Sequence, residues 1–197
     1  MLRDLLVSQR YAPPDPRGIC LRGARITGIL ELSEVQAAVG MELRDCWVDE
    51  QMRLRDASVP WLSLSGSRVP ALVCDGLRVD GSLILREGFR TTGGRRLGGV
   101  RVPGARIGGR LDLSNAQLTG QDWPALIADG LQIGGDLILS SFHATAHSRL
   151  GTVRLAGAHI YGQLDLSSGI LINQDGAALI ADGLQVDGDL IPAGLLY

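Results

Sequence analysis

Three histidines are the first side chains whose type and spacing could support chemistry. His143 and His147 are four residues apart, the spacing at which one helix brings two imidazoles to a zinc ion. The segment around them lacks the apolar periodicity of a helix, and His159 falls on a different face of the repeat described below. We therefore predict that the histidines hold no metal.

Two aspartates could form a pair of catalytic carboxylates. Asp112 and Asp165 occupy equivalent outward positions two coils apart, which predicts a separation of ~10 Å. That separation is at the wide edge of the range for an inverting glycosidase. Asp75, Asp129 and Asp182 each precede a glycine, where aspartate ordinarily serves a turn. We predict no catalytic residue among them.

The cysteines and glycine-rich segments give no catalytic signature. Cys46 and Cys74 fall on inward positions and Cys20 on an outward one, without a recognisable base beside any of them. The glycine-rich segments 93–99 and 104–109 do not fit G-x-G-x-x-G and precede no helix, so no cofactor is predicted. A sparse, odd number of cysteines fits a reducing compartment, and we expect a cytoplasmic protein.

Composition limits the fold that could position these side chains. The chain has 197 residues, of which 27 are glycine and 4% are aromatic, while 45% are hydrophobic. This length suits one domain, and no apolar run approaches the ~18 residues of a membrane-spanning helix. The N-terminal segment is a poor signal peptide. A core of small aliphatic side chains at regular positions points to a repeat.

The repeat is visible as near-identical segments at constant spacing. PALVCDGLRVDGSLIL begins at Pro70, PALIADGLQIGGDLIL at Pro124 and AALIADGLQVDGDLI at Ala177, which are 54 and 53 residues apart. Between them, GARIGGRLDLS begins at Gly104 and GAHIYGQLDLS at Gly157. Both units share one pattern, so the true period is about half that spacing.

A finer rhythm inside the period predicts very short strands. Apolar or small residues come in pairs separated by one residue, such as Ala24/Ile26 and Leu62/Leu64, and successive pairs are five or six residues apart. Each pair predicts one strand with two side chains inward and one outward. Four such strands make a coil of 20 to 22 residues, which predicts about seven coils. From Leu83 the period lengthens to 26–28 residues, and the extra residues predict loops at one corner, at about 91–99, 119–125, 145–152 and 172–178.

The two ends of the chain differ from the repeat. Residues 1–10 have leucines at helical spacing and predict a short cap helix, and residues 11–18 form a proline-rich linker. We expect residues 19–197 to form a single β-solenoid domain. The apolar C-terminal residues suggest a homodimer contact through Ile191, Leu195, Leu196 and Tyr197.

The small-then-large inward pairs Ala24/Ile26 and Ala57/Val59 resemble those of the pentapeptide-repeat family. This resemblance implies an all-β, right-handed quadrilateral β-helix. Residues 18–191 more closely resemble large bacterial repeat proteins built from LRGARITG, LRVDG and ARIGGRLDLS units, which are often labelled "membrane-associated oxidoreductase". Six-residue steps and corner loops depart from the pentapeptide pattern. A leucine-rich repeat is the alternative fold, suggested by the segment 111–118.

Charge changes sign along the chain. Residues 1–110 hold 17 arginines and 12 acidic residues, whereas residues 111–197 hold two arginines and nine aspartates. The predicted rod is therefore basic in its first half and acidic in its second. Outward isoleucines alternate with arginines on one face, and exposed isoleucines indicate a cover or a partner. The candidate interaction surface comprises Trp47, Arg95, Arg96, Arg101, Trp123, Ile127, His147, Arg154 and Ile180.

These observations favour a non-catalytic binding or scaffold module with a protein partner. Nucleic acid is disfavoured, and no integral membrane segment is predicted. Two alternatives follow from the resemblances: a DNA-mimic regulator, because some pentapeptide-repeat proteins bind type II topoisomerases in that way, and an enzyme, which rests on the oxidoreductase label alone.

Overall fold

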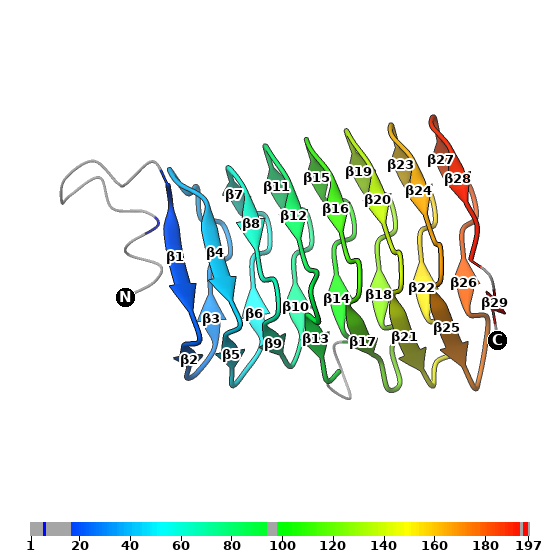
Figure 1. The fold of residues 1–197 in the computed structure, drawn as a ribbon, viewed down its shortest axis with the longest axis horizontal. Coiled ribbons are helices and arrows are strands. Elements are labelled where there is room, and N and C mark those ends of the chain that lie inside the picture. The colour runs from blue at the N-terminus through cyan, green and yellow to red at the C-terminus, as the bar shows by residue number, and fades with distance from the viewer. Residues whose placement is uncertain (1–5, 7–16, 94–97, 194, 197) are drawn as a thin grey trace.

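The protein is a parallel β-solenoid of stacked coils (Figure 1). The computed structural model describes Leu6 and residues 17–93, 98–193 and 195–196. Every element of regular structure in these ranges is a short strand, and most strands have two residues. Each strand pairs in parallel with the equivalent strands of neighbouring coils, which builds four sheets along the rod.

The chain visits four sheets in a fixed order, here named A, B, C and D. Sheet A holds β1 (Ile19–Arg22), β4 (Met41–Arg44), β8 (Leu62–Ser63), β12 (Leu83–Ile84), β16 (Leu111–Asp112), β20 (Leu137–Ile138), β24 (Leu164–Asp165) and β28 (Leu190–Ile191). Sheet B holds β2 (Arg25–Ile26), β5 (Trp47–Val48), β9 (Arg68–Val69), β13 (Arg90–Thr91), β17 (Gln117–Thr119), β21 (His143–Ala146), β25 (Ile170–Asn173) and β29 (Leu195–Leu196).

The other two sheets complete the four sides. Sheet C holds β3 (Leu30–Glu31), β6 (Met52–Arg53), β10 (Leu72–Val73), β14 (Val100–Arg101), β18 (Leu126–Ile127), β22 (Val153–Arg154) and β26 (Leu179–Ile180). Sheet D holds β7 (Ser58–Val59), β11 (Arg78–Val79), β15 (Arg106–Ile107), β19 (Gln132–Ile133), β23 (His159–Ile160) and β27 (Gln185–Val186).

The number of coils is lower than the sequence predicts. Sheet D has six strands within the described residues, so about six coils have a strand on all four sides, and the prediction of about seven is wrong. The first coil has only an isolated bridge on this side, between Gln36 and Ser58. The predicted number comes from counting apolar pairs in the sequence. The first coil contributes to that count because its side chains follow the same alternation, although its backbone forms no regular strand on sheet D.

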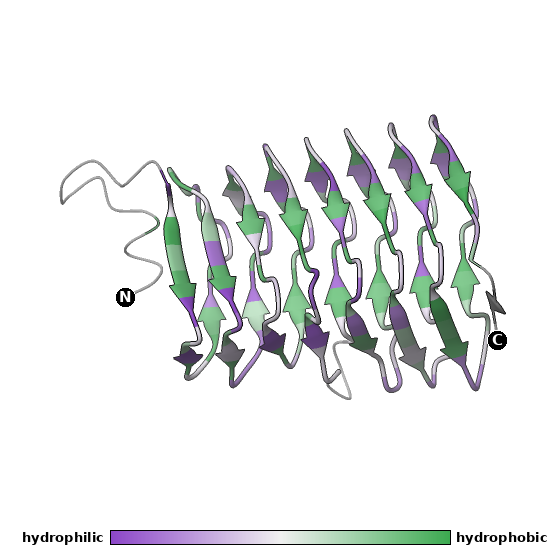
Figure 2. Ribbon diagram, viewed as in Figure 1, coloured by the Kyte–Doolittle hydropathy of each residue, from purple (hydrophilic) through white to green (hydrophobic). Residues whose placement is uncertain are grey.

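Alternation of side chains builds a narrow apolar core, as the two-residue rhythm predicts. In successive strands the same position faces inward, so Leu62, Leu83 and Leu111 stack as register partners on sheet A. Phe89 and Phe142 are both fully buried and are the largest of the fully buried side chains. Figure 2 shows hydrophobic residues recurring in the strands of successive coils.

The corners between sheets follow different rules. At the A–B and C–D corners one residue adopts a left-handed conformation, for example Asn115 with φ 57° and Gly130 with φ 64°. At the D–A corner glycines of successive coils bond to each other: the N–H of Gly109 donates to the carbonyl of Gly81 at 2.7 Å, and that of Gly135 to Gly109 at 2.8 Å. The fourth corner, between sheets B and C, carries the loops.

The predicted cap helix over residues 1–10 is not confirmed, because all of it except Leu6 lies outside the described residues. Leu6 is buried in the core, and its carbonyl accepts a hydrogen bond from the backbone N–H of Ala38 at 3.4 Å. Near the other end, Leu195 and Leu196 pair with Ile170 and Leu171 of the same chain as strand β29. Tyr197 lies outside the described residues, so the homodimer contact stays a prediction.

Candidate binding edge between sheets B and C

Long connections gather on one edge of the solenoid, the corner between sheets B and C. Those from β17 to β18, from β21 to β22 and from β25 to β26 lie along the lower edge in Figure 1. The register shows where they lengthen the coil: Leu62 and its partner Leu83 are 21 residues apart, whereas Leu83 and Leu111 are 28 apart. Insertions at equivalent corners of successive coils necessarily become neighbours in space.

Backbone hydrogen bonds extend the ladders into the loops. The N–H of Gly120 donates to Thr145 at 2.8 Å, that of His147 donates to Gln121 at 3.1 Å, and that of Gln174 donates to Ala146 at 3.3 Å. Neighbouring loops therefore support one another, as neighbouring strands do.

Asn173 fixes the loop that follows β21. Its Nδ2 donates to the carbonyls of Ser148 and Ala177, both at 2.9 Å, and its Oδ1 accepts from the backbone N–H groups of Ser148 at 3.3 Å and Asp175 at 3.1 Å. The Oγ1 of Thr152 adds a bond of 2.9 Å to the carbonyl of Ile172. One side chain thus ties two successive loops together, which pre-organises the surface that they form.

Two pockets flank Leu150, whose side chain is 44% exposed, and together we name them the loop cleft. The first, of about 320 Å³, is lined by Arg101, Pro103, Trp123, Pro124, Ile127, Asp129, Leu150 and Arg154. The second, of about 360 Å³, is lined by Asp122, His147, Ser148, Arg149, Leu150 and Asp175. The loop cleft therefore brings together five of the residues predicted for the interaction surface: Arg101, Trp123, Ile127, His147 and Arg154.

Ile127 faces outward from sheet C, yet it is only 8% exposed. The sequence places it in a column with Arg101, Arg154 and Ile180, and the register confirms that column. Trp123 and Leu150 line the same pocket as Ile127, so the loops cover part of the outward apolar surface. Ile180 is half-buried, and Gly151 of the loop approaches its side chain.

Arginines anchor the loop cleft to the sheet. The guanidinium of Arg154 donates to Asp129 Oδ2 through Nε at 2.9 Å and lies 2.8 Å from it through a second nitrogen. The same side chain donates to the carbonyl of Leu150 at 3.4 Å. Two coils earlier, Arg101 pairs with Asp75 at 3.2 Å. Asp75 and Asp129 thus each hold an arginine of the next coil, a contact beyond the turn role that the sequence assigns them.

Trp47 lies on the same edge but in an earlier coil, apart from the loop cleft. Its side chain is 51% exposed, and the guanidinium of Arg68 lies over the ring at 5.5 Å from its centroid. A pocket of about 390 Å³ is lined by Trp47, Val48, Asp49, Arg68, Val69, Pro70, Arg90 and Thr92. We name this the Trp47 pocket.

Arg95 and Arg96 lie outside the described residues. Sequence reasoning missed Leu150, Arg68 and Arg90. The last two share an outward column with Trp47 and could have been found by aligning the strands; Leu150 carries only the weak signal of an apolar residue in a polar loop.

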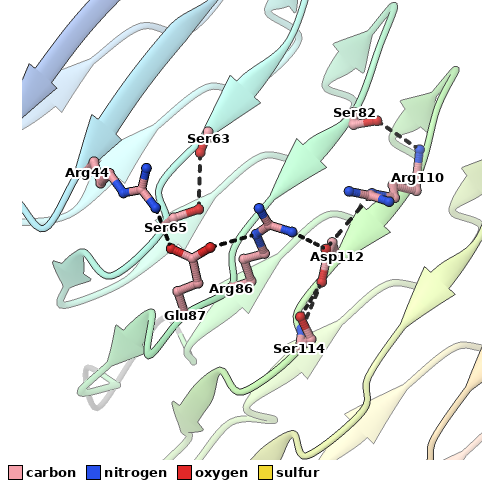
Figure 3. Close-up of polar contacts among 9 residues, drawn as sticks. All are labelled: Arg44, Ser63, Ser65, Ser82, Arg86, Glu87, Arg110, Asp112 and Ser114. Atoms are coloured by element: carbon pink, nitrogen blue, oxygen red, sulfur yellow. Dashed lines mark hydrogen bonds and ion pairs between the residues drawn. The ribbon is translucent and has the colours of Figure 1, made fainter.

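A polar network covers part of sheet A in the basic half of the protein (Figure 3). Arg44 binds Glu87 at 2.7 Å, Arg86 lies 3.2 Å from Glu87, and Arg86 and Arg110 lie 3.7 and 3.9 Å from the carboxylate of Asp112. The hydrogen bond to Glu87 raises the pKa of the Arg44 guanidinium. Through this network, Arg86 joins neighbouring coils, and the pair of Arg44 with Glu87 joins coils that are two steps apart.

The carboxylates considered for catalysis are engaged in local structure. Asp112 Oδ1 accepts from the backbone N–H of Ser114 at 3.0 Å and from its hydroxyl at 2.7 Å. Asp165 Oδ1 accepts from the N–H of Ser167 at 2.8 Å. The register confirms that Asp112 and Asp165 are two coils apart in one column, separated by Ile138.

The cysteines and histidines lie where the repeat places them. Cys46 and Cys74 are buried and Cys20 is exposed; burial raises the pKa of the Cys74 thiol well above its usual range. His143 is exposed on sheet B, whereas His159 on sheet D binds Asp187 at 3.1 Å and stacks on Tyr161. In the described ranges no three histidine, cysteine or acidic side chains are grouped to hold a metal ion.

The chain matches no family model, no curated protein and no solved structure. The stacked parallel coils are compatible with the pentapeptide-repeat resemblance, although no match supports that specific family. No helix in the part of the chain that the structure describes is long and apolar enough to cross a bilayer.

Proposed function

We propose that this protein is a non-catalytic binding module that presents the loop cleft to a protein partner. The observation that carries the proposal is the placement of exposed Leu150 between two pockets on a rigid edge, next to Trp123 and Arg154. Tryptophan and arginine are enriched at the energetic centres of protein interfaces.

The rigidity of the loops supports binding of a macromolecule. Asn173 bonds to both loops that flank the second pocket, and Arg154 ties the backbone of Leu150 to Asp129. A surface that is already ordered loses less conformational entropy when a partner binds. The cleft also has both apolar and charged linings, which suits the mixed surface of a protein better than a purely apolar ligand.

The proposal also covers the handedness of the solenoid, its likeness to pentapeptide repeats and its place in the cell. The solenoid would be right-handed and pentapeptide-repeat-like, and the protein would act in the cytoplasm, where its three unpaired cysteines stay reduced.

A comparison of two surface variants tests the proposal. Trp123→Ala combined with Leu150→Ser removes the apolar centre of the loop cleft. Tyr161→Ala is the matched control, because Tyr161 is 54% exposed and lies at the diagonally opposite D–A corner. We expect the native protein and the control to retain the same protein from a lysate, and the double variant to lose it. Equal retention by all three proteins would contradict the proposal.

A further inference from the structure

A column of outward side chains on sheet B combines cations with an aromatic ring. Arg25 pairs in register with Trp47, Trp47 with Arg68, and Arg68 with Arg90. Successive members are one coil apart, about 4.8 Å along the sheet. The column therefore places three guanidinium groups and one indole within about 15 Å on one face of the rod.

The charges of this column are unequally neutralised. The Nε of Arg25 donates to both carboxylate oxygens of Asp49, at 3.0 and 3.2 Å. Arg68 and Arg90 are exposed and form no ion pair with any side chain in the described ranges. Like charges on neighbouring strands repel, so a carboxylate placed between these two arginines would stabilise the pair.

The Trp47 pocket adds an apolar component beside these cations. Val69 and Pro70 line it together with the half-exposed indole, and its volume of about 390 Å³ suits one large side chain of a ligand. Asp49 at its margin is already bound by Arg25, which shows how a carboxylate is held on this surface. An apolar side chain flanked by acidic residues matches both components.

The charge of the rest of the molecule favours a short ligand over a long polyanion. The whole chain has a net charge of −2, and the acidic residues of 111–197 exceed the basic ones by seven. Beyond Arg90 the sheet B column continues with Gln117, His143 and Ile170. A nucleic acid extending along the rod would leave the basic patch within a few coils and approach the acidic half, which repels it.

We propose that the Trp47 pocket binds a short acidic peptide segment of a partner protein, with one apolar or aromatic side chain seated against Trp47. Its carboxylates lie between Arg68 and Arg90. This site shares no lining residue with the loop cleft, so the proposal does not depend on the function proposed for that cleft.

Selection from a phage-displayed library of random peptides against the intact protein provides the probe. We expect enriched sequences to carry aspartate or glutamate around one large apolar residue. The best sequence, synthesised with a fluorescein label, is then titrated by fluorescence anisotropy against the variants. Arg68→Glu combined with Arg90→Glu should weaken its affinity by about tenfold or more.

The matched control changes the same charge elsewhere. Arg78 and Arg106 are register partners on sheet D, both exposed, so Arg78→Glu combined with Arg106→Glu alters net charge equally. This control should retain the affinity within about twofold. Trp47→Ala leaves the charge unchanged and should also weaken binding, which separates a seated side chain from general attraction.

Three outcomes would overturn the proposal. The library could yield no enriched sequences or none with acidic residues; both charge variants could weaken binding equally; or a labelled single-stranded oligothymidine could bind more tightly than the peptide and lose affinity in the same variant. The last result would assign the pocket to nucleic acid. Circular dichroism of each variant checks that its fold is retained.

Discussion

A carboxylate followed two residues later by serine recurs as a small structural unit. Glu31, Asp112 and Asp165 each accept a hydrogen bond from the backbone N–H of that serine, at 3.1, 3.0 and 2.8 Å. The bond satisfies a donor at the point where the chain leaves a two-residue strand and turns a corner. The LELS and LDLS segments of the repeat therefore serve the turn.

Glu31 allows this role to be tested through pH. Hydrogen bonding by Ser33 lowers the pKa of its carboxyl below the ordinary value of 4.5, with a further contribution from Arg53, although partial desolvation opposes the shift. A lowered pKa in the folded state stabilises the fold above the unfolded-state pKa, and this contribution is lost as pH falls through the folded-state pKa. We expect Glu31→Gln to reduce the free energy of unfolding at pH 7 by less than about 1 kcal/mol.

Urea unfolding between pH 7 and about pH 3 measures the effect. The difference between Glu31→Gln and the native protein should shrink as the pH falls toward the acidic end. Glu50→Gln, which removes an exposed carboxylate, is the control. A difference that persists unchanged at the acidic end would show that the charge of Glu31 is irrelevant.

The direction in which a side chain points, into the core or away from it, could be predicted from the sequence for many residues. The inward positions of Cys46, Cys74, Phe89 and Phe142 follow directly from the two-residue alternation. The burial of Ile127 could not, because alternation defines which side of a strand a residue faces and says nothing about what a distant loop places over it.

At the scale of the strands and corners, glycine has two distinct uses. Gly130 has a left-handed φ of 64° and no neighbouring atom within 4 Å of an added Cβ. Gly134 lies at the D–A corner, where an added Cβ would meet the backbone carbonyl of Gly108 in the preceding coil. The first use is conformational, whereas the second is set by the close approach of stacked coils.

Two substitutions separate these uses. Gly130→Asn should change the free energy of unfolding by about 0.5 kcal/mol or less, because asparagine tolerates the left-handed conformation and the space is open. Gly134→Ala should destabilise the protein by about 1–3 kcal/mol, because the backbone of a packed coil must shift. Denaturant unfolding of both variants checks the ranking, and the reverse order would disprove it.

The strands and their columns could be predicted from repeat spacing, but their contacts could not. Aligning the repeats places Arg101, Ile127 and Arg154 in one column, which the register confirms. The pairing of Arg154 with Asp129 of the preceding coil depends on side-chain reach across a corner. The role of Asn173 in joining two loops is similarly invisible in the sequence, because its partners are mainly backbone groups.

At the scale of the whole molecule, large and small side chains alternate along the core. Phe89, Ala116, Phe142 and Gly169 each immediately precede residues that pair in register on sheet B. Each phenylalanine thus has a small residue at the equivalent place in the next coil, which leaves room for its ring. This arrangement explains how a narrow tube holds two rings without widening.

Phe142→Ala should therefore cost about 3–5 kcal/mol of unfolding free energy, because neighbouring coils cannot close around the cavity. Tyr161→Ala, at an exposed position, should cost less than about 1 kcal/mol. Guanidinium unfolding followed by circular dichroism measures both. A cost for Phe142→Ala equal to that of the control would show that the coils do collapse.

The parallel solenoid itself was predictable because every coil repeats the same pattern. The number of complete coils was overestimated because the pattern of side chains begins before sheet D has a regular strand, as the isolated bridge at Gln36 shows. The structure of the first and last coils depends on the residues that cover their open ends. The repeated pattern carries no information about those residues.

The constant register also bears on how the chain folds. Every strand pairs only with strands one coil away, so the loop that must close is short and similar everywhere along the rod. Register partners are 20 to 28 residues apart in a chain of 197, which corresponds to a relative contact order of about 0.10 to 0.14, between the values of helical bundles and of mixed α/β domains. We therefore expect folding to begin at any adjacent pair of coils and to spread outward coil by coil, faster than in most all-β proteins.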